Sequence, residues 1–284
     1  MPELPEVEVC RRGLQPEVTG ELILGAIVRS PRLRLPLPAT LGDTLAGQRV
    51  VAVRRRGKYL LLDCRGGVED GCLIIHLGMS GSLRFVANDK TPEKHDHVDI
   101  LFARQTLRLS DPRRFGVVLW QALGEAPHPL LAVLGIEPLA EEFTGDWLFA
   151  ATRGRAAPIK PVLMDSHLVV GIGNIYAAES LFRAGISPLR AASRISRERY
   201  RRLAPAIRQT LADAIAAGGS SIRDYVHSEG GAGCFQVDCA VYGRAGEPCR
   251  RCGGGHPSGS PGRQVDLLLP FRPTLKKARK SMFL

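Results

Sequence analysis

The hydrophobic pattern of this chain changes along its length, and that change restricts the fold more than any other feature. Short apolar runs separated by turn-rich segments recur through the first part, at Ile23–Val28, Val50–Val53, Tyr59–Leu62, Cys72–His76, Val98–Phe102, Thr106–Leu109 and Val117–Leu119. This cadence predicts the strands of a β-sandwich or a barrel. Beyond residue 150 the apolar spacing becomes that of helices, which we expect at 175–184 and 197–217.

The same pattern divides the chain into segments. A short helix is expected at residues 3–14, because Pro5 suits a first helical turn and acidic residues follow it. Prolines and glycines then mark a less regular connector, and the sequence after Gly218 is rich in glycine and cysteine. The expected organisation is a β-rich domain at 1–130, a connector at 131–150, a helical domain at 151–235 and a small appendage at 236–284.

The charge balance points to the kind of partner. Lys plus Arg number 39 against 28 Asp plus Glu, so the formal net charge is 39 − 28 = +11. Such a surplus favours a polyanion, nucleic acid before an anionic membrane. No run approaches the roughly 18 consecutive apolar residues of a membrane-spanning helix, and the acidic start is wrong for a secretory signal. We therefore expect a cytoplasmic protein whose 7 cysteines are reduced.

The amino terminus offers a possible nucleophile. Removal of the initiator methionine would expose Pro2 as a secondary amine, and an α-amino group has a reference pKa of about 7.7–8.0. The neutral amine can attack an aldehyde-like carbon and form an iminium. Glu3 is adjacent and could serve as a general acid or base. Taken alone, these residues fit an ordinary processed terminus with helix-capping acids better than they fit a reactive site.

Six motifs change that interpretation. They are MPELPEVE at 1–8, GKYL at 57–60, HLGMSG at 76–81, KHDHVD at 94–99, DPRRFG at 111–116 and GIGNIYAAE at 171–179. In this order they resemble the formamidopyrimidine-DNA glycosylase family, bacterial base-excision repair enzymes for oxidised purines. The resemblance runs from residue 1 to about Gly253. PELPE in place of PEGPE separates the chain from the related endonuclease VIII branch, which favours oxidised pyrimidines.

The resemblance implies a fold and a partner. The fold is α+β, with an N-terminal β-sandwich flanked by helices and a C-terminal helical domain with a helix–two-turn–helix and a truncated zinc-finger-like appendage. The partner is double-stranded DNA that contains oxidised purines (8-oxoguanine, formamidopyrimidines) or abasic sites. The protein would be a monomer in the bacterial cytoplasm, associated with the nucleoid.

The resemblance also implies a bifunctional reaction, DNA glycosylase followed by AP lyase. Pro2 would attack C1′ of the damaged nucleotide and release the base, and the resulting iminium would allow β- and δ-elimination. Glu3 would protonate the sugar ring oxygen. Lys58 matches the family's strand-borne lysine, which holds a phosphate or aids proton transfer. A solvated strand lysine is the alternative, which the surrounding RRRGKY sequence favours less.

Further matches concern extrusion of the base, which costs a few kcal/mol of unstacking. Met79, Arg113 and Phe115 match the family's wedge residues, which fill the vacated space. Methionine is deformable, phenylalanine stacks, and arginine can hydrogen-bond to the orphaned partner base. Glycines around both motifs favour exposed loop tips, and we expect Asp111 to hold the second loop.

Contacts to DNA are implied for four residues, by His95, Lys160 and Asn174 to the backbone and by Arg113 in the gap of the base stack. The glycines before Asn174 begin a predicted helix, and the free N–H groups of such a terminus suit phosphate. A metal site at His95 and His97 is an alternative that the spacing favours less than alternate strand positions. The segment 220–235 aligns with the family's flexible loop over the flipped base.

A zinc site is implied only in part. Cys249 and Cys252 form a CxxC motif after VYGRAGEP, the family's approach to a zinc finger, and a structural zinc site needs four ligands. No cysteine follows Cys252, and the only later histidine is His256. Zinc is therefore implied as a cofactor whose site is incomplete in this chain. We predict a shift of reading frame near 253–255, which sequencing of the encoding DNA would test.

The incomplete finger leaves an alternative function open. A protein of this fold could bind damaged DNA without cutting it, and we expect weakened DNA binding and reduced activity in the chain as written. A redox or zinc protein built on the CxxC motif has only those four residues in its favour.

Overall fold

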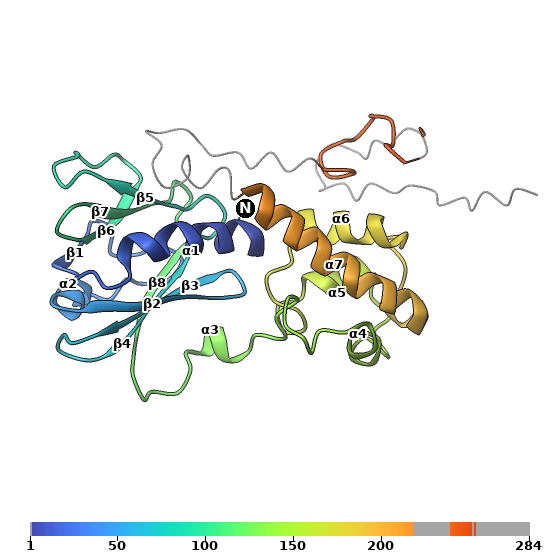
Figure 1. The fold of residues 1–284 in the computed structure, drawn as a ribbon, viewed down its shortest axis with the longest axis horizontal. Helices are drawn as coiled ribbons and strands as arrows, with labels where there is room; N and C mark the ends of the chain where they lie inside the picture. Colours follow the sequence, from blue (N-terminus) through green and yellow to red (C-terminus); the bar gives the residue numbers. More distant parts are fainter. Residues whose placement is uncertain (1, 219–238, 252, 254–284) are drawn as a thin grey trace, which may run out of the picture.

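The computed structural model describes residues 2–218, 239–251 and 253. The predictions for Cys252, for His256, for the loop at 220–235 and for the tail after Gly253 lie outside the described residues. Two β-sheets lie at one end of the molecule and a group of helices at the other, with the amino terminus between them (Figure 1).

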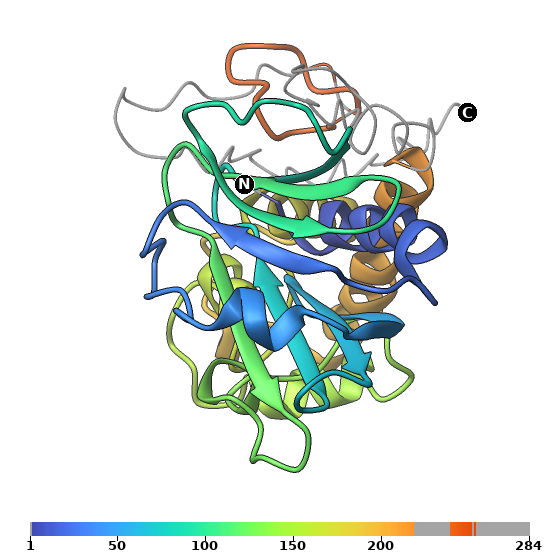
Figure 2. The same cartoon turned by 90° about the vertical axis from the view of Figure 1, so that its left-hand side faces the viewer.

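The N-terminal part is a sandwich of two antiparallel four-stranded sheets (Figure 2). The first has the order β1 (Gly25–Val28), β6 (Asp96–Leu101), β7 (Thr106–Ser110), β5 (Ser82–Val86), and the second has the order β2 (Arg49–Arg56), β3 (Tyr59–Arg65), β4 (Gly71–His76), β8 (Val117–Ala122). Alternate side chains of both sheets point inward, so that Leu62 and Leu73 of one sheet share a core with Ile100 and Leu107 of the other. The predicted choice between sandwich and barrel is therefore decided in favour of the sandwich.

Strand β5 was absent from the predicted strands. Its sequence SLRFV alternates, with Leu83 and Phe85 buried and the residues between them half-buried. The alternation covers only 5 residues with two buried positions, so it is weak as a sequence signal. Pairing of β5 with β7 supplies the backbone hydrogen bonds that complete the strand.

Helix α1 (Leu4–Val18) joins the two halves of the molecule. Leu14 and Val18 pack in the sandwich core, whereas Leu4 packs in the helical core. The helix was expected at residues 3–14, and the structure extends it through Pro16. It continues to Val18 because that side chain is fully buried, and the gain from burial outweighs the hydrogen bond that proline cannot donate.

The C-terminal part is a helical core. Its helices are α4 (Gly145–Ala151), α5 (Ile159–Met164), α6 (Asn174–Ala184) and α7 (Arg197–Gly218), with a short 3-10 turn at Ala192–Arg194. Two further short helices, α2 (Leu41–Leu45) and α3 (Pro129–Ala132), lie outside this core. Tyr176 of α6 and Tyr200 of α7 are among its largest fully buried side chains. The expected connector at 131–150 thus contains helix, because Thr144 caps the start of α4 through the N–H of Trp147.

The last described segment, 239–251, is held against α6 by one carboxylate. Glu179 accepts the backbone N–H groups of Ala240, Val241 and Tyr242 at 2.8–2.9 Å. Val241 is buried, so an apolar contact accompanies these hydrogen bonds. Within the described part of the chain, no helix is long and apolar enough to span a membrane.

Candidate active site

The carboxylate of Glu3 lies against the start of α6. One oxygen accepts the N–H of Gly173 at 2.6 Å, and the other accepts the N–H of Ile175 at 3.0 Å. The N–H of Tyr176 adds a longer bond of 3.4 Å. Because the first N–H groups of a helix have no partner within the helix and carry partial positive charge, they suit a carboxylate. Glu3 is only 1% exposed and is therefore fixed in place by this helix terminus.

Two glycines make this approach possible. A Cβ on Gly173 would lie 2.4 Å from Cδ of Glu3, and a Cβ on Gly171 would lie 2.7 Å from Cβ of Leu4. Gly171 also has a φ of +83° and accepts the N–H of Leu4 at 2.9 Å. The prediction that these N–H groups remain free for phosphate is wrong, because Glu3 occupies them. Asn174, the first residue of α6, remains partly exposed beside them.

A second carboxylate fixes the amino-terminal backbone. Glu6 accepts the N–H of Glu3 at 2.7 Å through one oxygen and the hydroxyl of Tyr176 at 2.5 Å through the other. Pro2 precedes Glu3 directly and is partly exposed. The structure therefore anchors the residue after Pro2 from two sides and leaves Pro2 itself accessible.

Lys58 lies in the two-residue turn between β2 and β3, so the expectation of a strand-borne lysine is wrong. Gly57 has a φ of +56° and donates its N–H to Glu137 at 2.6 Å. Arg55 and Arg56 also donate to Glu137, at 2.8 and 3.2 Å. A glutamate of the connector thus fixes the turn that carries Lys58.

The charges of Glu3 and Lys58 influence each other. Burial raises the pKa of Glu3, and the nearby Lys58 cation and the α6 N–H groups act in the opposite direction. Burial likewise lowers the pKa of Lys58, opposed by Glu3 and Glu6. The two pKa values therefore approach each other, which suits groups that donate and accept protons during one reaction.

His76, at the end of β4, received no role from the sequence, although it begins the HLGMSG motif. Burial, followed by the Lys58 and Arg34 cations, lowers its pKa to about 4, so the ring is neutral at pH 7. Its Nδ1 accepts the N–H of Gly78 at 3.0 Å, which leaves the proton on Nε2. His76 therefore presents a neutral hydrogen-bond donor near Lys58.

The three predicted wedge residues lie on two exposed loops. Met79 follows β4 and is 39% exposed, and Phe115 precedes β8 and is 42% exposed. The guanidinium of Arg113 stacks over the Phe115 ring at 4.9 Å from its centroid. These exposed fractions are large for apolar side chains and agree with loop tips available for insertion.

The second wedge loop is anchored at Asp111. Its carboxylate accepts the N–H of Gly116 at 2.7 Å, which confirms the predicted structural role. His97 contacts the Asp111 carbonyl at 2.9 Å and the Ser30 hydroxyl at 2.8 Å. Both ring nitrogens of His97 are thus engaged, which removes it as a metal ligand. His95 accepts the N–H of Asp111 through its carbonyl, and its side chain is partly exposed next to this loop.

Two further predicted residues are buried. Lys160 in α5 is 4% exposed, so phosphate contact there remains a prediction that this arrangement supports poorly. Cys249 is 3% exposed, and its Sγ accepts the N–H of Arg251 at 3.4 Å. Among the described residues no cluster of three or more His, Cys, Asp or Glu side chains could hold a metal ion. The described residues thus supply Cys249 and no complete set of zinc ligands.

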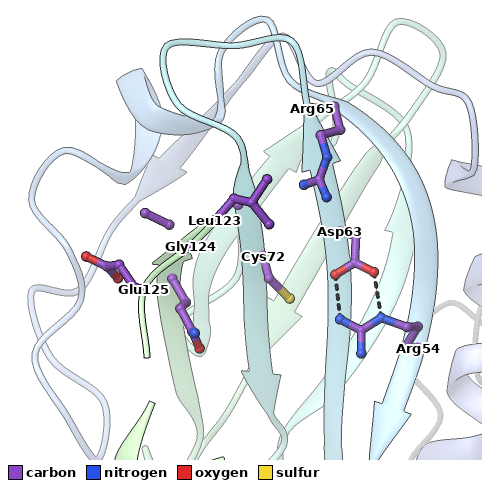
Figure 3. A pocket seen from close by; sticks show the side chains of 10 residues that line it. Arg54, Asp63, Arg65, Cys72, Leu123, Gly124 and Glu125 are labelled. Carbon is purple, nitrogen blue, oxygen red and sulfur yellow. Dashed lines mark hydrogen bonds and ion pairs between the residues drawn. The ribbon is translucent and has the colours of Figure 1, made fainter. Parts of the chain in front are cut away.

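A surface hollow lies away from these residues, on the outer face of the second sheet (Figure 3). Arg54 and Asp63 form a bidentate pair there, with bonds of 2.5 and 2.7 Å. Burial raises the pKa of the neighbouring Cys72 to about 12, so the thiol is not reactive at pH 7. We assign the hollow no part in the chemistry.

Comparisons with known proteins agree with this geometry. The sequence profile of the formamidopyrimidine-DNA glycosylase N-terminal domain matches residues 1–118, and that of its H2TH domain matches residues 134–226. A formamidopyrimidine-DNA glycosylase of Dechloromonas aromatica is 69% identical over 258 residues, which cover 89% of this chain and 93% of the relative.

Solved structures are similar over most of the chain. Wild-type Lactococcus lactis Fpg (MutM) in complex with DNA containing N7-benzyl-Fapy-dG is 36% identical, with a TM-score of 0.81 over 92% of this chain and 96% of that chain. A structure of MutM with DNA containing carbocyclic 8-oxo-G is 35% identical, with a TM-score of 0.81 and the same coverage. The chain belongs to the formamidopyrimidine-DNA glycosylase family.

Proposed function

We propose that this protein excises oxidised purines from double-stranded DNA and then cuts the strand at the resulting abasic site, with Pro2 as the nucleophile. The observation that carries the proposal is the fixation of Glu3 by α6, which holds a buried carboxylate next to an accessible amino-terminal residue. The family relatives bear the name of this activity, and the solved neighbours contain Fapy-dG and 8-oxo-G DNA. Such a reaction takes place where the bacterial DNA is, in the cytoplasm.

The first stage replaces the base by the protein. After removal of Met1, the lone pair of the Pro2 nitrogen forms a bond to C1′ while the glycosidic bond to the damaged base breaks. The departing base takes the electron pair of that bond, and the proton lost from the Pro2 nitrogen neutralises it. Glu3 donates a proton to the ring oxygen O4′, the C1′–O4′ bond opens, and the iminium forms. The raised pKa of Glu3 favours the protonated form that this step needs.

The second stage uses the iminium as an electron sink. Loss of a proton from C2′ expels the 3′ phosphate, and loss of a second proton after rearrangement expels the 5′ phosphate. Water then hydrolyses the remaining iminium and regenerates Pro2. The Lys58 ammonium and the Nε2–H of His76 suit phosphate oxygens during these steps, because a cation and a neutral donor lie near each other.

Borohydride trapping tests the proposal, since reduction of the iminium links protein and DNA irreversibly. We expect an adduct with a duplex that contains 8-oxoguanine, mapped to Pro2 by peptide mass, and none with undamaged duplex. Glu3→Gln should lose the adduct with 8-oxoguanine but keep it with a preformed abasic site. The open aldehyde of that site needs no protonation at O4′.

One observation favours a second candidate. The chain has one CxxC motif where a zinc finger needs two, so the finger that the family uses to hold DNA is incomplete. The alternative is therefore a protein that binds damaged DNA without cutting it. Tight binding to 8-oxoguanine duplex with no adduct at saturating DNA, in protein shown to begin at Pro2, would establish the alternative and exclude the enzyme.

A further inference from the structure

A single carboxylate connects the two wedge loops. Asp111 accepts the hydroxyl of Ser80 at 2.8 Å through Oδ1 and the N–H of Gly116 at 2.7 Å through Oδ2. Ser80 directly follows Met79, and Gly116 directly follows Phe115. The two bonds therefore join the bases of both wedge side chains across separate parts of the sequence.

The backbones of the loops are also in direct contact. A Cβ on Gly78 would lie 2.4 Å from the carbonyl carbon of Phe115, so only glycine permits this approach. Arg114 has a φ of +56°, the only positive φ of a non-glycine residue in the described part of the chain. This left-handed conformation costs free energy and persists only where its surroundings hold it. Asp111 contributes here too, because its carbonyl accepts the Arg114 N–H at 3.2 Å.

Asp111 itself is immobilised by the sandwich. It is fully buried, its N–H donates to the His95 carbonyl, and its carbonyl contacts His97. The Ser80 hydroxyl also accepts the N–H of Arg113 at 3.3 Å. It therefore connects the first loop to both Asp111 and Arg113 of the second. A fixed anchor with bonds to each loop therefore holds the two loops together.

We propose that Ser80 is a positioning residue for base extrusion, whose hydroxyl joins the Met79 loop to the Arg113–Phe115 loop through Asp111. This inference rests on the proposed function, in which these side chains fill the gap in the stack. Unstacking is unfavourable until the gap is filled, so insertion from both loops at once gives the lower barrier. Without the hydroxyl, the Met79 loop is no longer fixed to the other loop before insertion. Its conformational entropy is then lost during insertion, which raises the barrier.

The experiment measures extrusion directly. Single-turnover mixing with a duplex that carries 2-aminopurine next to 8-oxoguanine reports unstacking by fluorescence, and excision is followed in the same samples. We expect Ser80→Ala to slow both about tenfold, which corresponds to about 1.4 kcal/mol in the barrier. Trapping at a preformed abasic site, where no base remains to be extruded, should stay close to the wild-type rate.

Two variants serve as controls. Ser80→Thr retains a hydroxyl and should restore extrusion to within about threefold of wild type, and Ser82→Ala in β5 removes a nearby hydroxyl outside the loops. Thermal melting verifies that each variant is folded. The inference would be overturned if Ser80→Ala extruded the base at the wild-type rate. It would also be overturned if Ser80→Ala and Ser80→Thr slowed extrusion equally. Absence of trapping and excision in the wild-type protein would instead refute the proposed function, so the two failures are distinguishable.

Discussion

At the scale of single residues, Glu3 at the N-cap of α1 and Glu8 within the helix have opposite electrostatic environments. Burial raises the pKa of Glu3, whereas hydrogen bonds from Arg11 and Arg12 outweigh burial at Glu8 and lower its pKa to about 2. Glu8 also pairs with Arg55 at 3.2 Å. The first carboxylate is prepared to carry a proton and the second to remain charged. Two turns of one helix thus combine a chemical and a structural role.

The Glu8 environment predicts a pH-dependent stability. A depressed pKa stabilises the folded state fully above pH 4.5, the usual value, and the contribution is lost as the pH falls toward 2. We expect Glu8→Gln to lower the free energy of unfolding at pH 7 by about 2 kcal/mol, after allowance for solvent screening. Denaturant titrations at pH 7 and below pH 3 measure the difference. A loss that is equally large at low pH, or an equal loss in the exposed Glu17→Gln control, would contradict the prediction.

At the scale of secondary structure elements, the start of α6 is the feature that organises the site. Its N–H groups bind Glu3, its Tyr176 hydroxyl binds Glu6, and further along the helix Glu179 holds the segment 239–251. One helix therefore positions the amino terminus and the last described segment together. The turn between β2 and β3 is positioned separately, by Glu137.

Gly173→Ala tests the role of this helix start. The φ of Gly173 is −127°, which alanine adopts without strain, so the effect should come from the Cβ that would meet Glu3 at 2.4 Å. We expect kcat for 8-oxoguanine excision to fall about 100-fold, the cost of displacing a catalytic group by about 1 Å. Glu17→Gln, an exposed change near the other end of α1, is the control. Unchanged kcat in folded Gly173→Ala would show that the position of Glu3 is not critical.

At the scale of the whole molecule, the site lies where the two cores meet. Pro2 and Glu3 begin a helix that packs in both cores, Lys58 comes from the sandwich, and α6 comes from the helical part. Relative displacement of the two parts would separate Lys58 from Glu3 and α6. Catalysis therefore depends on the packing of α1 as much as on the reactive groups.

The +11 charge predicts a steep salt dependence of DNA binding. With about four cations on phosphates, the slope of log K against log salt is about −3.6, and affinity falls about 150-fold between 50 and 200 mM salt. Fluorescence anisotropy with a duplex that carries an uncleavable abasic analogue measures the slope. Lys58→Met should reduce its magnitude by about one. A slope near zero would show that the surplus charge lies away from the DNA.

The incomplete CxxC pair predicts independence from zinc. We expect Cys249→Ser to excise 8-oxoguanine at the wild-type rate and the purified wild-type protein to contain less than stoichiometric zinc. Metal analysis beside the excision assay provides both measurements. One zinc ion per chain, together with loss of DNA binding in Cys249→Ser, would show that ligands beyond the described residues complete the site.

How far the sequence could predict the elements depended on the strength of each local pattern. The long apolar period of α7 and the alternation of most strands identified those elements, since each pattern repeats over a whole element. Strand β5 and helix α4 were missed, because β5 has only 5 residues and α4 is a helix of 7 residues that follows a segment marked by prolines. Both are stabilised by partners distant in sequence.

The sequence by itself determined the family and supplied the proposed reactive groups. Side-chain chemistry is a property of single residues, and the ordered motifs from residue 1 to residue 179 already indicated an amine nucleophile, its acid and the wedge residues. The basic charge likewise follows from composition alone.

Only the tertiary structure decided which groups meet. It assigned the N–H groups of α6 to Glu3 instead of phosphate, moved Lys58 from a strand to a turn, and buried Lys160. It also joined Ser80 to Asp111 and gave His76 a neutral ring. The physical reason is that hydrogen bonds and pKa values depend on distance and burial. Those quantities arise from packing between segments far apart in the chain, which a local sequence pattern does not contain.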